Sequence, residues 1–265
     1  MSFRNMWTED WTTNKLIYWR NRYVKSIFDI SVKDIAIISP HELLISTGES
    51  QLKLLNGNTG KLTNSQYDVA PLIAYSIHID RNQRFIIGAT SPGPMFPISG
   101  RRLVKVFDKE GYKVTEYEHD SNGKPLFSFP YKITSTSNGN IFVIDFYSKE
   151  NEPDFHPGRV VVIGQTGNIL QIYAGHGDVN LRSNFMPRSI ITTPLLDNVI
   201  LADSLTHSLH ILNNEGQILT CCQTFRLDHD MLFPYALAFS RPEHIFISCL
   251  YQRSKLYEVK YSGFF

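Results

Sequence analysis

The stretch GNIFVIDFYSKENEPDFHPGRVVVIGQTGNILQIY, residues 139–173, contains the pattern that decides the fold. A short apolar strand, IFVID at 141–145, is followed by a loop and by a second strand, RVVVI at 159–163. A turn with two glycines, GQTGN, then leads into a third strand, ILQIY at 169–173. β-Branched and aromatic residues bounded by Gly, Asn and Pro are typical of short strands joined by turns. The stretch therefore predicts three antiparallel strands.

This unit recurs along the chain. Its first strand is visible in six copies, NMWT, HELLIS, QRFIIGA, GNIFVID, DNVILAD and EHIFISC, which begin at residues 5, 41, 83, 139, 197 and 243. A further strand precedes each later copy, as at 131–135 and 189–192. Most copies also contain a tight turn whose glycine is expected to take a positive φ. These glycines are Gly60, Gly111, Gly167 and Gly216.

Four antiparallel strands repeated every ~40 to 55 residues are typical of propeller blades. The sequence therefore predicts an all-β fold, a six-bladed β-propeller with blades of four antiparallel strands, as a single domain over 1–265. The first and last blades are expected to be incomplete, since the first copy begins near Asn5 and the last ends at Phe265. We therefore expect an N-terminal stretch to be absent from this chain. The blade cores are predicted near 5–33, 34–66, 73–118, 130–174, 187–224 and 234–265.

Composition narrows the classes of function. A formal net charge of +1 gives no overall electrostatic reason to expect binding to DNA, RNA or an anionic membrane. No apolar run reaches the length of a signal peptide or a membrane span, so a cytoplasmic protein is expected. The three cysteines form neither a disulfide framework nor a zinc motif and are expected to be reduced. No cofactor is predicted.

The units NGNIFVIDFYS, GRVVVIGQTGNILQIY and DNVILADSLTHSLHILNNEGQIL, with MPRSIITT and FPYALAF before two of the copies, resemble the NHL-repeat propeller of tripartite-motif proteins. The likeness is to the expanded molluscan set and covers nearly the whole chain. It implies a non-catalytic module that recognises the substrate of a ubiquitin ligase. The RING, B-box and coiled-coil modules of that family are absent here, so its ligase chemistry cannot reside in this chain.

The main enzymatic alternative is a metal-dependent propeller hydrolase of the lactonase or arylesterase kind. Asp145 and Asp203 end equivalent strands, and Glu49 lies near the same place in an earlier copy. Recurrence at one blade position favours a structural role, because Asp side chains readily accept hydrogen bonds from nearby backbone amides. His207 and His210 are expected on opposite faces of a strand. We therefore predict no metal site and no catalytic residue.

The longest loops all fall on one predicted face of the propeller, and binding residues commonly lie in such loops. On this loop-rich face, the connections between copies end in Phe-Pro-Tyr, Met-Pro-Arg and Phe-Pro-Tyr. The Phe, Met and Pro residues are expected to pack and to form turns, whereas Tyr and Arg are frequent interface anchors. We therefore predict that a protein or peptide partner binds Tyr131, Arg188 and Tyr235, with Arg182 and Arg226 nearby.

RNA is the second candidate partner, because some propellers of the resembled family bind RNA through a basic version of this face. Here the loops of that face carry more acidic than basic residues, which disfavours a phosphate backbone. Arg101, Arg102, Arg182, Arg188 and Arg226 are the residues that could form a local basic patch. The sequence thus ranks protein recognition first and RNA second.

Overall fold

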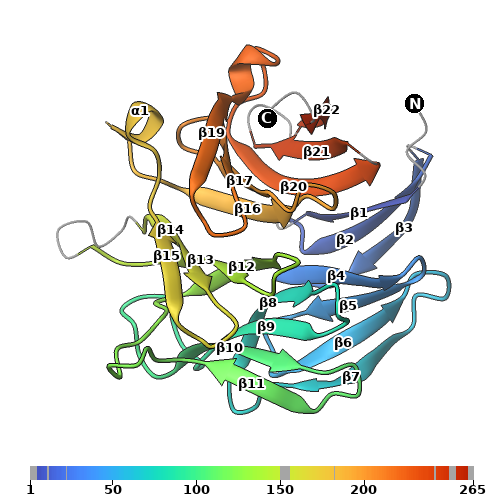
Figure 1. The fold of residues 1–265 in the computed structure, drawn as a ribbon. Helices are drawn as coiled ribbons and strands as arrows, with labels where there is room; N and C mark the ends of the chain where they lie inside the picture. Colours follow the sequence, from blue (N-terminus) through green and yellow to red (C-terminus); the bar gives the residue numbers. More distant parts are fainter. Residues whose placement is uncertain are drawn as a thin grey trace. The chain divides into compact units, whose positions relative to one another are not determined.

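The computed structural model describes residues 5–261 except 11, 22, 150–155, 182, 242 and 251–254. Within these residues, the chain forms 22 strands in six antiparallel sheets, one four-residue helix and one short 3-10 helix. The sheets are separate blades, and consecutive strands pair within each of them (Figure 1). The chain divides into two compact units, each of which contains three blades.

The first unit consists of two segments, the chain up to Gly93 and Ser99–Glu116. Among the described residues, blade 1 has three strands and blades 2 and 3 have four each. Their bounds are β1 (Asn5–Asp10), β2 (Lys15–Arg20) and β3 (Tyr23–Asp29); β4 (Asp34–Ser39), β5 (Glu42–Ser46), β6 (Gln51–Asn56) and β7 (Leu62–Asp68); and β8 (Ile73–Ile79), β9 (Phe85–Thr90), β10 (Arg102–Phe107) and β11 (Lys113–Tyr117).

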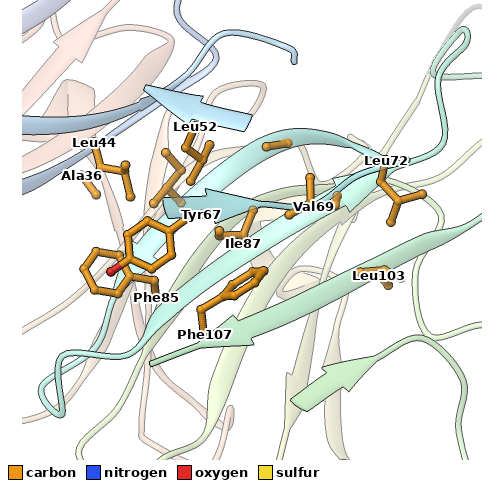
Figure 2. Packing of buried hydrophobic residues seen from close by; sticks show 13 residues of the cluster. Ala36, Leu44, Leu52, Tyr67, Val69, Leu72, Phe85, Ile87, Leu103 and Phe107 are labelled. Carbon is orange, nitrogen blue, oxygen red and sulfur yellow. The ribbon is translucent and has the colours of Figure 1, made fainter. Parts of the chain in front are cut away.

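The larger hydrophobic cluster described in the first unit joins blades 2 and 3, and a smaller one joins blades 1 and 2. Figure 2 shows Tyr67 of β7 close to Phe85 and Phe107, and its ring stacks on that of Phe85 with centroids 4.2 Å apart. Hydrogen bonds also join the two blades, since the Asp34 carboxylate accepts from the Ile77 backbone N–H at 2.9 Å. Burial between neighbouring blades is what stabilises each sheet, because a single blade cannot cover both of its own faces.

The second unit contains Pro94–Ile98 and the chain from Tyr117 onward. Blades 4 and 5 have four strands and blade 6 has three among the described residues. Their bounds are β12 (Pro130–Ser135), β13 (Ile141–Phe146), β14 (Gly158–Ile163) and β15 (Ile169–Tyr173); β16 (Pro187–Thr192), β17 (Val199–Asp203), β18 (Ser208–Leu212) and β19 (Ile218–Gln223); and β20 (Pro234–Arg241), β21 (His244–Cys249) and β22 (Lys255–Lys260). The helix α1 (Gly177–Asn180) and the 3-10 helix η1 (Thr224–Arg226) lie in the connections between them.

The first strands of blades 4, 5 and 6 lie side by side: β12 contacts β16, and β16 contacts β20. Hydrogen bonds fix this arrangement, since the Thr134 and Thr192 hydroxyls are 2.8 Å apart and Ser189 Oγ accepts from the Leu237 N–H at 3.1 Å. The second strands β13 and β17 are buried at every residue, whereas β15 at the outer edge of blade 4 is largely exposed. Residues on the first strands are therefore among those that neighbouring blades bring together.

The architecture is a six-bladed β-propeller, which confirms the fold class predicted from the repeats, including the shorter first and last blades. The four turn glycines have the expected positive φ, between 71° and 91°. No helix among the described residues has the length and apolar character needed to span a membrane.

Candidate binding surface

Blades 4, 5 and 6 share one local arrangement, which we call the corner: the start of the first strand, a buried proline, lies opposite the end of the second strand. Pro130 pairs with Asp145, Pro187 with Asp203 and Pro234 with Cys249, so each first strand starts opposite the end of its second strand. Proline suits the first position of a strand because it has no N–H to donate. In each blade, a backbone N–H at or just after the end of the second strand donates to the carbonyl of the residue that precedes the proline, at 3.1 Å. These bonds join Phe146 to Phe129, Ser204 to Met186 and Leu250 to Phe233.

A β-bulge follows each of these prolines. The register shifts between Pro130 and Lys132, between Pro187 and Ser189, and between Pro234 and Ala236. The extra residues are Tyr131, Arg188 and Tyr235, the three that the sequence predicts as anchors. A bulged residue is released from the ladder and its side chain is redirected, and such bulges are frequent beside functional sites.

Arg188 lies between Tyr235 and a fourth residue, Phe146. Its guanidinium carbon lies 5.3 Å from the ring centre of Phe146 and 5.8 Å from that of Tyr235. The Tyr131 ring is 4.9 Å from that of Phe146. Tyr131, Phe146, Arg188 and Tyr235 thus form a continuous series of contacts across three blades, which we call the anchor row. Phe146 is buried, and the other three side chains are half-buried.

Asp145 and Asp203 fix the backbone just before Pro130 and Pro187, next to the residues of the anchor row. The Asp145 carboxylate is fully buried and accepts from the backbone N–H groups of Ser128 and Phe129, both at 2.7 Å, and from Arg159 at 2.9 Å. Burial raises the pKa of Asp145, while Arg159 and the two N–H groups act in the opposite direction. These contacts support the structural role expected for the recurring aspartates.

Asp203 makes the equivalent contacts in blade 5. One carboxylate oxygen accepts from the Met186 N–H at 3.0 Å, and the other accepts from Thr206 at 2.6 Å and Asn180 at 2.9 Å. In blade 6 the position is taken by Cys249, which cannot serve as a carboxylate clamp. There the Phe233 N–H donates instead to His207 Nδ1 at 3.0 Å.

His210 occupies a buried polar cluster between blades 4 and 5. Its Nε2 is 3.5 Å from Asp203 Oδ2, and its Nδ1 is 2.7 Å from the Tyr173 hydroxyl and 3.5 Å from Cys221 Sγ. A Cys-His-Asp series could in principle activate a thiol. Here burial raises the pKa of Cys221 to about 11, and the Tyr173 hydroxyl is the nearer neighbour of Nδ1. This arrangement favours a neutral thiol over a nucleophile.

His207 and His210 also have different partners, Phe233 and the Tyr173 cluster. Within the described part of the chain, no group of three or more His, Cys, Asp or Glu side chains is placed to hold a metal ion.

The remaining sequence-predicted residues are placed as follows. Arg226 is exposed on η1, and Arg182 lies outside the described residues. Arg101 pairs with Glu116 at 3.2 Å, and Arg102 is buried and donates to backbone carbonyls. Sequence reasoning missed Phe146, although its position directly after Asp145, opposite the Phe-Pro-Tyr connection, could have indicated a corner residue.

No protein-family model matches the chain, and no curated protein matches it with significance. Among solved structures, it is similar to a protein of unknown function from Bacteroides caccae (14% identity, TM-score 0.67), over 98% of this chain and 90% of that one. It is also similar to streptogramin B lyase (16%, TM-score 0.58; 97% and 79%) and to the calcium-binding protein regucalcin from Agrobacterium tumefaciens (13%, TM-score 0.60; 95% and 84%). At these identities the likeness shows the propeller fold alone, and propellers of this shape include both binding proteins and enzymes.

Proposed function

We propose that this propeller is a non-catalytic platform that binds a protein or peptide through the anchor row. The observation that supports this most is the convergence of Tyr131, Arg188 and Tyr235 from equivalent bulges of three consecutive blades. Tyr and Arg are enriched among the residues that dominate binding energy, above all where they are partly desolvated and held in place by neighbours. Here ring contacts hold Arg188 in place.

The resemblance to NHL propellers of tripartite-motif proteins supports a more specific version of the proposal. In that version, the propeller recognises the substrate of a ubiquitin ligase, and the ligase modules belong to another part of its parent protein. The single propeller domain and a cytoplasmic location belong to the same proposal. The blade sequences quoted above support the ubiquitin-ligase part of this proposal, since the solved structures bear only on the fold.

A peptide selection tests the proposal even though the partner is unidentified. The purified chain is used to select from a phage-displayed library of random 12-residue peptides, in parallel with the triple variant Tyr131→Ala, Arg188→Ala, Tyr235→Ala. Arg241→Ala is the matched control, because Arg241 lies on the same strand as Tyr235, at the opposite end, and pairs with Glu258. We expect peptides to be enriched by the wild type and by the control, and to be lost with the triple variant. Melting temperatures of all three proteins show whether folding is preserved.

Three results would contradict the proposal. One is that no peptide is enriched; another is that enriched peptides bind the triple variant equally well. The third is a different ligand at the same residues: if fluorescein-labelled random RNA binds at 50 mM salt and the triple variant abolishes this, the row recognises nucleic acid. Elemental analysis is a further check, since stoichiometric calcium or zinc in the purified protein would favour the hydrolase alternative.

A further inference from the structure

The guanidinium of Arg188 is held in place but not neutralised. The rings of Phe146 and Tyr235 lie against it at 5.3 and 5.8 Å. Among the described residues, no carboxylate lies within ion-pair distance of Arg188 and no hydrogen bond to its guanidinium is formed. The Asp145 carboxylate, which precedes Phe146 in β13, is already occupied by Arg159 and two backbone N–H groups. Arg188 therefore keeps its N–H donors available for a ligand.

A half-buried guanidinium without an anionic partner costs free energy in the unbound protein, and a bound anion would offset this cost. Arg188 is half-buried, so part of its hydration has been removed without a compensating anion. The ring contacts reduce the number of conformations of the side chain, so less entropy is lost when a ligand binds. A planar guanidinium with a free edge matches the two oxygens of a carboxylate in a bidentate pair.

We infer that Arg188 binds a carboxylate of the partner, while an adjacent apolar side chain of that partner packs on Tyr131 and Tyr235. This inference rests on the proposed function and specifies its ligand. A single carboxylate is favoured over a phosphate because the row offers one unpaired guanidinium. Arg159 is committed to Asp145, and Lys132 lies over the Tyr131 ring at 5.7 Å. The loops predicted from the sequence to lie on this face carry more acidic than basic residues, which disfavours a multiply charged anion.

A double-mutant cycle on the selected peptides provides the test. Affinities are measured for one enriched peptide and for its Glu→Gln or Asp→Asn version, against the wild type, Arg188→Lys and Arg188→Gln. C-terminally amidated and free-acid forms of each peptide distinguish a side-chain carboxylate from a terminal one. With the wild-type protein, neutralising the relevant carboxylate of the peptide should weaken its affinity at least tenfold. With Arg188→Gln, the original and the neutralised peptide should bind with equal affinity. Arg188→Lys keeps the positive charge but not the two parallel N–H donors of the guanidinium. It should therefore bind the original peptide better than Arg188→Gln does, but recover less than half of the change in log Kd between the wild type and Arg188→Gln.

The outcomes separate this inference from the proposed function. If peptides bind through the row but their affinity is unchanged when every carboxylate is neutralised, the inference is wrong and the binding platform stands. A phosphoserine peptide that binds more tightly than its Glu version, with the gain lost in Arg188→Gln, would also overturn it in favour of phosphate. If peptide affinity is unchanged by substitution of Tyr131 and Tyr235 as well as Arg188, the proposed function itself is wrong.

Discussion

Replacing Asp145 with alanine should destabilise the protein by about 3–5 kcal/mol, the usual result of removing one partner of a buried charge pair. The carboxylate is fully buried and accepts from Ser128, Phe129 and Arg159. Its removal leaves the two backbone N–H groups without this acceptor and the Arg159 guanidinium without its carboxylate. For a chain of this length, the change corresponds to a fall of about 10 °C in melting temperature.

Urea unfolding followed by far-UV circular dichroism measures this loss, with calorimetry for the melting temperature. Asp29→Ala is a suitable control, because the Asp29 side chain is 89% exposed and its ion pair with Lys15 is long, at 4.0 Å. Such an exposed pair should contribute less than about 1 kcal/mol. The double variant Asp145→Ala, Arg159→Met should be less destabilised than the sum of the two single changes, since it removes the unpaired cation as well.

A result below about 1 kcal/mol for Asp145→Ala would refute the structural role of the recurring aspartates. A carboxylate reserved for a metal or substrate commonly destabilises the free protein, and its removal is then neutral or stabilising. The same experiment on Asp203 extends the test to blade 5, where the carboxylate accepts from the Met186 N–H.

Three other residues provide further tests. Gly158→Ala should destabilise the protein by about 1–3 kcal/mol, measured by urea unfolding, because a Cβ there would lie 2.6 Å from the Pro187 ring; an unchanged midpoint would contradict this. Burial lowers the pKa of His78 to about 4. The fold therefore keeps His78 neutral, and stability should fall by about 1–3 kcal/mol between pH 6.5 and pH 4; His78→Gln should flatten this decline, and an identical pH profile would refute the assignment. Cys221, whose pKa is raised to about 11, should react with iodoacetamide at pH 7.5 more than tenfold slower than a cysteine peptide, whereas rapid labelling would indicate activation by His210.

Much of the fold could be predicted from the sequence because a propeller repeats its local pattern. The turn glycines, the paired apolar strands and the prolines before the first strands all act within one blade, where sequence distance is short. Tyr131, Arg188 and Tyr235 could be singled out for the same reason, since each directly follows its proline, and their role as binding anchors stays a prediction.

What the sequence did not predict depends on contacts between blades. Phe146 completes the row only because β13 ends opposite the start of β12 and beside Arg188 of the next blade. The cluster of His210 with Tyr173 joins blades 4 and 5 over 37 residues, and no spacing rule relates the two. The burial of Arg102, expected as part of a surface patch, likewise depends on its environment in β10 rather than on its neighbours in sequence.

The affinity of one selected peptide for the wild type and for the Tyr131→Ala, Arg188→Ala, Tyr235→Ala variant tests the central proposal most directly. Anchors of this kind contribute about 2 kcal/mol or more each, so the account predicts at least a hundredfold weaker binding. Arg188→Gln alone provides a second measurement if the triple variant is poorly folded. An affinity within threefold of the wild type, in variants that melt normally, would contradict the proposal that the anchor row is the binding site.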